Sequence, residues 1–269
     1  IVHEVIYDQD KKRATGVRVI DSVNNQSYEY FAKVIFLCSS TVGSTSILMQ
    51  SKSERFPNGM GNDSGELGHN LMDHHFQVGA SGTFKGFKNK ITYGRKPAGF
   101  YIPRFRNIGG ITDRKDFIRG YQYQGGASRG FMSIADSAEE LISYGPKFKE
   151  NIVKRDEWTA SMNGFGEILP YHENKMYLDY DKTDEWGLPT VTFDAEIKEN
   201  ELAMRKDMQS QAVEMLEKAG FKNVKAWEDH YSMGLGIHEM GTARMGRDPK
   251  TSVLNSYNQL HEVPNVFIT

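Results

Sequence analysis

The start of the chain alternates apolar and polar residues over short stretches. The segments VHEVIYD (2–8), ATGVRVID (14–21), QSYEYFA (26–32) and KVIFLCS (33–39) are rich in β-branched and aromatic residues. Polar or glycine-containing turns separate them, which is the pattern of β-strands. The last segment is apolar without alternation, which predicts a strand buried on both faces. It leads into STVGSTSILMQ (40–50), where a helical apolar pattern follows small residues, so a strand–tight turn–helix unit is predicted.

The middle of the chain is less regular. Residues 52–75 are typical of a loop. Residues 76–160 predict mainly strands with long connections, and the segment DSAEELISYG (136–145) predicts a helix there. Strands return between residues 161 and 198, at NKMYLDYD and PTVTFDAEI.

The clearest helix is predicted near the C-terminal end, over Glu199–Ala219. Apolar residues recur there at helical spacing, and Gly220 follows as a stop signal. The remaining residues, 221–269, predict loop, a histidine-containing stretch and a final strand. The elements together indicate an α+β, or mixed α/β, fold.

Composition excludes several classes of function. The chain has 269 residues, 38% hydrophobic and 25% charged, with a net charge of -2. These values are typical of a globular protein and do not indicate nucleic-acid or anionic-membrane binding. Cys38 is the single cysteine, so no disulfide framework is expected. No apolar run reaches the roughly 18 residues of a membrane span. The chain begins and ends in strand-like runs, so we expect a piece of a longer protein.

The stretch GIHEMGTARMGRDP (236–249) is the first candidate for chemistry. His238 lies there among Gly234, Gly236 and Gly241. Imidazole accepts a proton near neutral pH, and glycines let a backbone approach a flat ligand closely. Thr242 and Arg244 are candidates to orient the loop. The alternative is a structural histidine in a glycine-rich turn.

Three other stretches were weighed against ordinary structural explanations. The turn after KVIFLCS either contacts a dinucleotide or is a plain strand–helix connection. In LGHNLMDHH, the residues His69, Asp73, His74 and His75 suggest a metal site, but their spacing favours a capped turn with surface histidines. The stretch from residue 166 to 194 either lines a sugar or alcohol pocket or forms a hairpin with a polar connection.

Taken in this order, the stretches resemble the glucose–methanol–choline (GMC) family of flavoprotein oxidoreductases. The segment from His238 to Thr269 resembles the family's C-terminal block with its catalytic histidine. Residues 32–52 resemble the strand and helix under the FAD, with Gly43, Ser44 and Ser51 at matching positions, and GELGHNLMDHH resembles the G-x-N-L-x-D-H element. The segments EILPYHEN and WGLP are similar to the branch of pyranose oxidases and bacterial sugar dehydrogenase large subunits.

The resemblance implies roles for four residues. His238 matches the histidine that takes the hydroxyl proton of the substrate beside the flavin. Val2 matches a position whose backbone faces the FAD adenine, and Cys38 and Ser39 match small residues near the ribose and diphosphate. The family's G-x-G-x-x-G turn is missing, and its second catalytic residue would fall past Thr269. The chain alone is therefore expected to be inactive and not to hold FAD stably.

The resemblance also implies a division of the chain. Residues 1–75 and 231–269 would belong to a Rossmann-like FAD-binding domain, and residues 76–230 to an antiparallel-sheet substrate-binding domain with helices. The expected function is oxidation of a sugar or polyol CH–OH group with FAD as cofactor and no metal. Oxygen, a quinone or a cytochrome remain open as electron acceptor. The alternatives are a non-catalytic carbohydrate-binding protein and a metal enzyme built on His69, His74 and His75.

Overall fold

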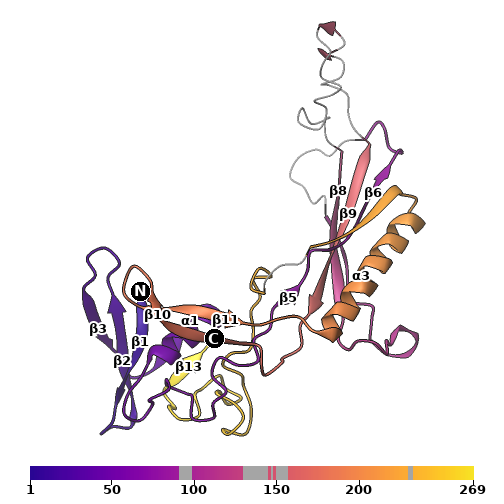
Figure 1. Ribbon diagram of the computed structural model, residues 1–269. Helices are drawn as coiled ribbons and strands as arrows, with labels where there is room; N and C mark the ends of the chain where they lie inside the picture. The colour runs from indigo at the N-terminus through magenta and orange to yellow at the C-terminus, as the bar shows by residue number, and fades with distance from the viewer. Residues whose placement is uncertain (91–98, 130–144, 147, 150–156, 230–232) are drawn as a thin grey trace. The chain divides into compact units, whose positions relative to one another are not determined.

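The N-terminal strands form an antiparallel sheet in chain order, as predicted. It consists of β1 (Val2–Asp8), β2 (Arg13–Ile20) and β3 (Ser27–Phe31) (Figure 1). The computed structural model describes residues 1–90, 99–129, 145–146, 148–149, 157–229 and 233–269. The helix predicted over 136–145 lies outside the described residues apart from Gly145.

The chain divides into two structural units. Unit 1 comprises Ile1–His74, Ile168–Glu196 and Ser232–Thr269, and unit 2 comprises His75–Glu167 and Ile197–Tyr231. The sequence-based division differs from this in one segment, because Ile168–Glu196 lies in unit 1 rather than with the rest of residues 76–230.

A parallel strand pair and a helix form the second part of unit 1. Strand β4 (Ile35–Leu37) pairs in parallel with β13 (Val266–Ile268) and leads directly into α1 (Ser40–Gln50). A parallel pair followed by a helix is the arrangement expected of a Rossmann-like remnant. The strand, the helix and the final strand were all predicted from the sequence.

Strand β4 is not buried on both faces, so that prediction is wrong. Ile35 and Leu37 are buried, whereas Phe36 is 60% exposed and stacks on Phe267 with ring centroids 5.1 Å apart. Successive side chains of a strand point to opposite faces of a sheet. The core of unit 1 covers one face of β4, and the Phe36 side is open to solvent in the described residues.

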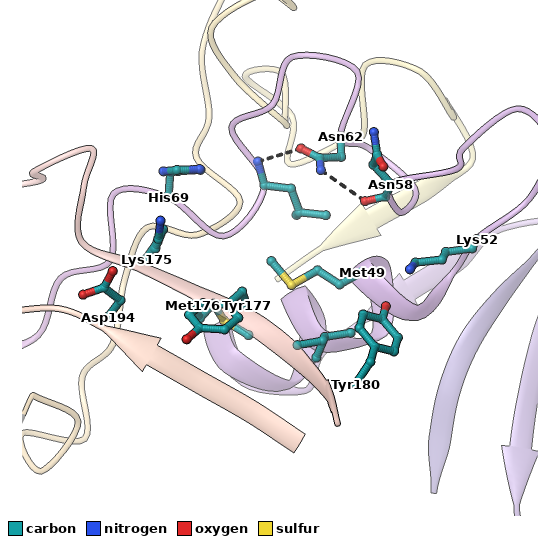
Figure 2. A pocket seen from close by; sticks show the side chains of 12 residues that line it. Met49, Lys52, Asn58, Asn62, His69, Lys175, Met176, Tyr177, Tyr180 and Asp194 are labelled. Carbon is teal, nitrogen blue, oxygen red and sulfur yellow. Dashed lines mark hydrogen bonds between the residues drawn. The ribbon is translucent and has the colours of Figure 1, made fainter. Parts of the chain in front are cut away.

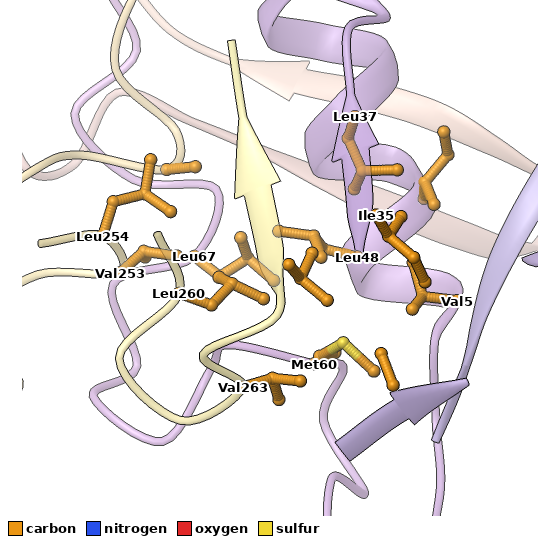
Figure 3. Close-up of a cluster of buried hydrophobic side chains, with 14 of the residues drawn as sticks. Val5, Ile35, Leu37, Leu48, Met60, Leu67, Val253, Leu254, Leu260 and Val263 are labelled. Carbon is orange, nitrogen blue, oxygen red and sulfur yellow. The ribbon is translucent and has the colours of Figure 1, made fainter. Parts of the chain in front are cut away.

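The core of unit 1 joins segments that are far apart in the sequence (Figure 3). The side chains drawn there come from β1, β4, α1, the loop after α1 and the C-terminal segment. They include Val5, Ile35, Leu37, Leu48, Met60, Leu67, Val253, Leu254, Leu260 and Val263. This shared core fixes α1 against the C-terminal segment, which also carries His238.

A hairpin completes unit 1. Strands β10 (Lys175–Thr183) and β11 (Pro189–Asp194) pair antiparallel. Asp184 closes their connection, since its Oδ1 accepts hydrogen bonds of 2.9 Å from the backbone N–H groups of Trp186 and Leu188. This is the hairpin with a polar connection that the sequence suggested.

Unit 2 contains an antiparallel sheet. Its strand order is β12 (Lys222–Glu228), β6 (Val78–Phe84), β9 (Trp158–Glu167), β8 (Tyr121–Ser128) and β7 (Gly99–Ile102), and β5 (His74–His75) also pairs with β9. Strand β12 was predicted as loop, and this is corrected. It is an edge strand rich in lysine, and charged residues on an edge strand weaken the apolar alternation that identifies a strand.

Helix α3 (Glu199–Lys218) packs on one face of this sheet (Figure 1). The carboxylate of Glu201 accepts a 2.9 Å hydrogen bond from the backbone N–H of Lys198, and Gly220 with φ 89° ends the helix, as predicted. A short 3-10 turn, η1 (Gly110–Thr112), lies between β7 and β8. No helix among the described residues is long and apolar enough to cross a membrane.

Candidate functional site

The segment that carries His238 is fixed along one side by the loop before β5. Met72 and Met240 exchange two backbone hydrogen bonds of 2.9 and 3.0 Å. The backbone N–H of Thr242 donates to the carbonyl oxygen of His69 at 2.9 Å. The histidine segment is therefore held as a short irregular ladder rather than as a free loop.

Helix α1 fixes the same segment along another side. The Thr41 hydroxyl donates to the carbonyl oxygen of Glu239 at 2.7 Å. The hydroxyl groups of Thr45 and Thr242 lie 2.8 Å apart, and both residues are fully buried. The sequence suggested Thr242 as a residue that orients the loop, and this contact gives it that role.

Asp73 lies beneath the segment and accepts hydrogen bonds from its backbone. Its Oδ2 accepts from the N–H groups of Gly234 at 3.1 Å and Gly236 at 2.8 Å. Its Oδ1 accepts from the N–H groups of His238 at 3.2 Å and His74 at 2.7 Å. Asp73 is only 3% exposed. One buried carboxylate therefore joins the backbone of His74 to the backbone of the segment that carries His238.

Two of the glycines are explained by contacts inside the protein. A Cβ on Gly236 would lie 2.4 Å from Asp73 Oδ1, and a Cβ on Gly241 would lie 1.9 Å from the carbonyl oxygen of Asn70. Gly241 also has φ 87°, in the left-handed region that favours glycine. The sequence suggested that these glycines let a flat ligand approach, whereas in the structure they allow the segment to pack against residues 70–73.

His238 is exposed, and three apolar residues of the same segment are exposed with it. Leu235, Ile237 and Met240 are 58%, 76% and 54% exposed on the same segment. The ring of His74 meets the ring of His238 edge to face, with centroids 5.0 Å apart. A neutral imidazole in this position can accept a proton from a group brought to it, and the apolar side chains can cover a flat or apolar ligand.

The three predicted cofactor-binding residues line one cavity, although they come from different strands and turns. The cavity measures about 500 Å³ and lies beside β4. Its lining residues are Val2, Gly16, Val17, Tyr30, Phe31, Ala32, Val34, Ile35, Phe36, Leu37, Cys38, Ser39 and Ile47. The structure therefore brings Val2 next to the Cys38–Ser39 turn, 36 residues away in the sequence.

A second cavity lies at the start of α1. Ser40 and Val42, at the start of α1, line a cavity of about 330 Å³ that also reaches Asp73 and Glu239. Ser39, the N-cap residue that precedes α1, makes no side-chain capping hydrogen bond, and the first turn of the helix holds no acidic residue. The N–H groups of a helix start attract anions, so the turn between the two cavities suits a phosphate group.

The histidines considered for a metal site lie apart. The ring of His69 stacks on that of His172 with centroids 4.1 Å apart, and its Nδ1 donates to the carbonyl oxygen of His172 at 2.7 Å. His74 faces His238, and His75 is buried in unit 2 beside Gly166. Within the described part of the chain, no three histidine, cysteine, aspartate or glutamate side chains gather to hold a metal ion.

The β10–β11 hairpin lines a cavity of about 540 Å³ against the loop after α1 (Figure 2). The hairpin contributes Lys175, Tyr177, Tyr180 and Asp194 to the lining, and α1 contributes Met49. The Lys52 ammonium lies over the Tyr180 ring, 4.2 Å from its centroid. The hairpin predicted for this stretch is confirmed, and the stretch also lines a cavity; that the cavity takes a sugar or alcohol stays a prediction.

Sequence reasoning missed two residues of the site. Asp73 was considered only as a metal ligand, and Thr45 was not considered. Three of the four partners of Asp73 follow it by 161 to 165 positions, and Thr45 and Thr242 are 197 positions apart. The G-x-N-L-x-D-H element was the one available signal, because it contains Asp73.

Comparison with known proteins identifies the family. Two family models described as GMC oxidoreductase match residues 1–76 and 170–269. The 2-methyl-1,2-propanediol dehydrogenase of Mycolicibacterium austroafricanum is 28% identical, with 95% of this chain and 46% of that protein covered. The fructose dehydrogenase large subunit of Gluconobacter japonicus is 24% identical, with 100% of this chain and 48% of that protein covered.

Solved structures agree on the fold. A formate oxidase matches 99% of this chain and 54% of its own length with a TM-score of 0.56 and 15% identity. An FAD-dependent oxidoreductase from Chaetomium thermophilum matches 100% of this chain and 55% of its own, with a TM-score of 0.51 and 13% identity. The chain spans about half the length of the relatives it matches. On the two family models and the shared fold, the chain belongs to the GMC oxidoreductase family.

Proposed function

We propose that the whole protein is an FAD-dependent oxidoreductase that oxidises a CH–OH group of a sugar or polyol, with His238 as the base. The observation that carries the proposal is the exposed His238 imidazole on a segment fixed by Asp73 and by α1. Relatives named as dehydrogenases of a diol and of fructose support the substrate class. The electron acceptor is left unspecified.

The residues present fit part of an FAD molecule. The cavity beside β4 has largely apolar walls suited to an adenine ring, and Val2, Cys38 and Ser39 line it. It ends at the uncapped start of α1, where backbone N–H groups favour a diphosphate. Ser40 there has φ 61°, an uncommon value for serine, and such backbone strain concentrates at functional turns. Val2, Cys38 and Ser39 would hold the adenosine and diphosphate parts.

The chemistry follows from the position of the imidazole. An alcohol hydroxyl that reaches His238 can give its proton to an imidazole nitrogen, and this weakens the neighbouring C–H bond. FAD, when bound, would supply the two-electron acceptor for the hydride that this carbon loses. Leu235, Ile237 and Met240, which are exposed on the same segment, would cover a bound ligand and reduce the access of water to the proton.

The division of labour between the units is part of the proposal. Residues 1–75 and 231–269 would contribute to FAD binding. The antiparallel sheet and α3 of unit 2 would contribute to binding of the alcohol substrate.

The test uses the full-length protein and anaerobic stopped-flow spectroscopy. His238→Ala is expected to slow flavin reduction by an alcohol substrate about 100-fold or more, the range of general-base catalysis. His172→Ala is the control, because that side chain is 58% exposed and belongs to the same unit. Flavin reduction by His238→Ala at the parent rate would refute the assignment of the base.

The 269-residue chain alone is expected neither to oxidise an alcohol nor to retain FAD. Its relatives use roughly twice this length, and the G-x-G-x-x-G turn is not among its residues. The measurement is gel filtration of the purified chain after incubation with FAD, followed by a visible spectrum. Co-elution of one flavin per chain would contradict this expectation.

The second candidate function is non-catalytic binding of a carbohydrate. One observation favours it, the cavity of Figure 2, in which Tyr177 and Tyr180 accompany the charged groups of Lys175 and Asp194. Tyrosine rings and polar groups are common in sugar sites. Calorimetric titration of the flavin-free chain with sugars tests it, and Tyr180→Ala should abolish binding. Absence of heat with every sugar would remove this candidate.

A further inference from the structure

The Asp73 carboxylate has an unusual set of partners. It is 3% exposed, and all four of its hydrogen bonds come from backbone N–H groups at 2.7 to 3.2 Å. No ion pair within the described part of the chain includes Asp73. Backbone dipoles therefore take the place of water around a buried charge, which needs such partners to be tolerated.

Three of the four donors lie on the segment that carries His238, and the fourth is the residue after Asp73. Gly234 and Gly236 precede the histidine, the third donor is the backbone of His238 itself, and the fourth belongs to His74. The ring of His74 in turn lies edge to face against the ring of His238, with an interplanar angle of 90°. One carboxylate thus sets the backbone that carries the imidazole and the backbone of the ring that packs against it.

The backbone of Gly236 lies very close to the Asp73 carboxylate. A Cβ at Gly236 would lie 2.4 Å from Oδ1 and 2.8 Å from Oδ2 of Asp73. No side chain fits at position 236 unless the carboxylate or the segment moves. A glycine at position 236 is required because of the space that the Asp73 carboxylate occupies, and not because of the backbone conformation of the turn.

We infer that Asp73 is a positioning residue for the reaction: its carboxylate gathers the backbone N–H groups of residues 234–238 and so holds the His238 imidazole where the substrate hydroxyl arrives. This inference rests on the proposed role of His238 as base. An asparagine at position 73 keeps the shape of the side chain, but its NH₂ group would face donors and replace one acceptor oxygen. The backbone on that side would separate from it, and the imidazole would shift.

The experiment compares three variants of the full-length protein. Asp73→Asn removes the negative charge of the carboxylate. Gly236→Ala keeps that charge but disturbs the contact between the carboxylate and the backbone of residue 236. Asp184→Asn is the matched control, because Asp184 also accepts two backbone N–H groups in unit 1, at the β10–β11 connection. Two quantities are measured for each variant: the anaerobic rate of flavin reduction, and the hydrogen exchange of the amides of residues 234–238.

The expected result separates positioning from general loss of structure. Asp73→Asn and Gly236→Ala should both accelerate amide exchange at 234–238 at least tenfold, with exchange in α3 unchanged. Both should slow flavin reduction about 100-fold, the cost of a misplacement of about 1 Å, with KM changed less than kcat. Asp184→Asn should change neither the exchange at 234–238 nor the rate. If Asp73→Asn is not obtained folded, Gly236→Ala carries the test.

Two outcomes overturn the inference. If the amides of residues 234–238 exchange at the parent rate in both Asp73→Asn and Gly236→Ala, the carboxylate does not order the segment. Faster exchange with a parent rate of flavin reduction would mean that the order does not serve catalysis. The His238→Ala variant distinguishes these outcomes from failure of the proposed function: if it reduces flavin at the parent rate, His238 is not the base, and the inference fails with the function.

Discussion

The hydroxyl groups of Thr45 and Thr242 lie 2.8 Å apart in the interior of unit 1, 197 positions apart in the sequence. This single contact ties the middle of α1 to the glycine-rich segment that carries His238. A second hydrogen bond of α1 to that segment comes from Thr41, one turn earlier. The helix that begins at the proposed diphosphate site therefore also supports the proposed base.

Removing one hydroxyl of the Thr45–Thr242 pair should lower the free energy of unfolding more than removing both. Thr45→Val leaves the buried hydroxyl of Thr242 without its partner, and the free energy of unfolding should fall by about 1–3 kcal/mol. The double variant Thr45→Val, Thr242→Val removes both hydroxyls and should recover much of the loss, because valine keeps the shape of threonine. Urea denaturation of the four proteins in the cycle checks this. A double variant with the sum of the two single losses would show that the hydroxyls do not interact.

Gly241 should not tolerate a side chain. Its φ of 87° costs any other residue about 1–2 kcal/mol, and a Cβ would also lie 1.9 Å from the Asn70 carbonyl oxygen. Gly241→Ala is expected to lower the free energy of unfolding by about 3 kcal/mol or more, because the two effects add.

Gly234 provides the matched control for Gly241. It has φ 106° in the same segment, but a Cβ there would meet nothing within 4 Å. Gly234→Ala should therefore show the backbone cost alone, about 1 kcal/mol. Thermal denaturation of both variants measures the difference, and equal losses would mean that the close approach of Gly241 to Asn70 is relieved at no cost.

The sequence predicted those parts of the fold that depend on local patterns. The four N-terminal strands, the helix α3 and its stop at Gly220 were found because their apolar periodicity and turn residues lie within a few positions of one another. Strand β12 was missed because its neighbour β6 lies about 140 positions earlier in the chain, and its own residues are mostly polar. The exposure of Phe36 was missed for a similar reason, since it depends on what lies against β4.

The candidate site was predicted only in part. The glycine-rich stretch singled out His238, a resemblance gave roles to Val2, Cys38 and Ser39, and the structure adds that these last three line one cavity. The role of Asp73 was not predictable, because a carboxylate that accepts backbone N–H groups leaves no side-chain pattern at its partners. The tight contacts of Gly236 and Gly241 could not be told apart from ligand contacts for the same reason.

Asp207 should be a major source of stability in unit 2. Its carboxylate accepts from Arg106 Nε at 2.7 Å and from the hydroxyl of Tyr121 at 2.6 Å, and its side chain is 5% exposed. Arg114 lies 3.4 Å away on the other oxygen. Burial raises the pKa of Tyr121, so its hydroxyl stays protonated and remains a donor. Asp207→Asn should lower the free energy of unfolding by about 3 kcal/mol, because the charge of Arg106 is left poorly compensated.

The control for Asp207 is an exposed pair on α3. The Glu214 carboxylate and the Lys218 ammonium lie 2.6 Å apart at the surface of the helix, and Glu214→Gln should leave the stability nearly unchanged, because solvent screens an exposed pair. Hydrogen exchange of the α3 amides measures both effects in the same unit. Equal effects of the two variants would show that burial adds nothing to the Asp207 pair.

Glu262 should make the stability of unit 1 depend on pH. Both carboxylate oxygens are buried, and neither has a hydrogen-bond partner in the described part of the chain. Burial raises the pKa of Glu262 above its ordinary value of 4.5, and the nearby Asp63 carboxylate adds to the rise, while the backbone N–H of Glu262 itself, His261 and Arg55 oppose it. The folded state therefore binds this proton more tightly than the unfolded chain does. The resulting stabilisation is complete below pH 4.5 and is lost as the pH rises through the raised pKa.

The variant Glu262→Gln removes this titration while keeping the size of the side chain. We expect it to be more stable than the parent at pH 8, because the parent then buries an unpaired charge. The advantage should shrink as the pH falls towards 5, because the parent side chain becomes protonated and neutral. Melting temperatures of both proteins between pH 5 and 8 give the comparison, and Glu217→Gln, at an exposed position of α3, is the control. Parallel pH profiles for the parent and Glu262→Gln would show that this carboxylate ionises freely in the folded protein.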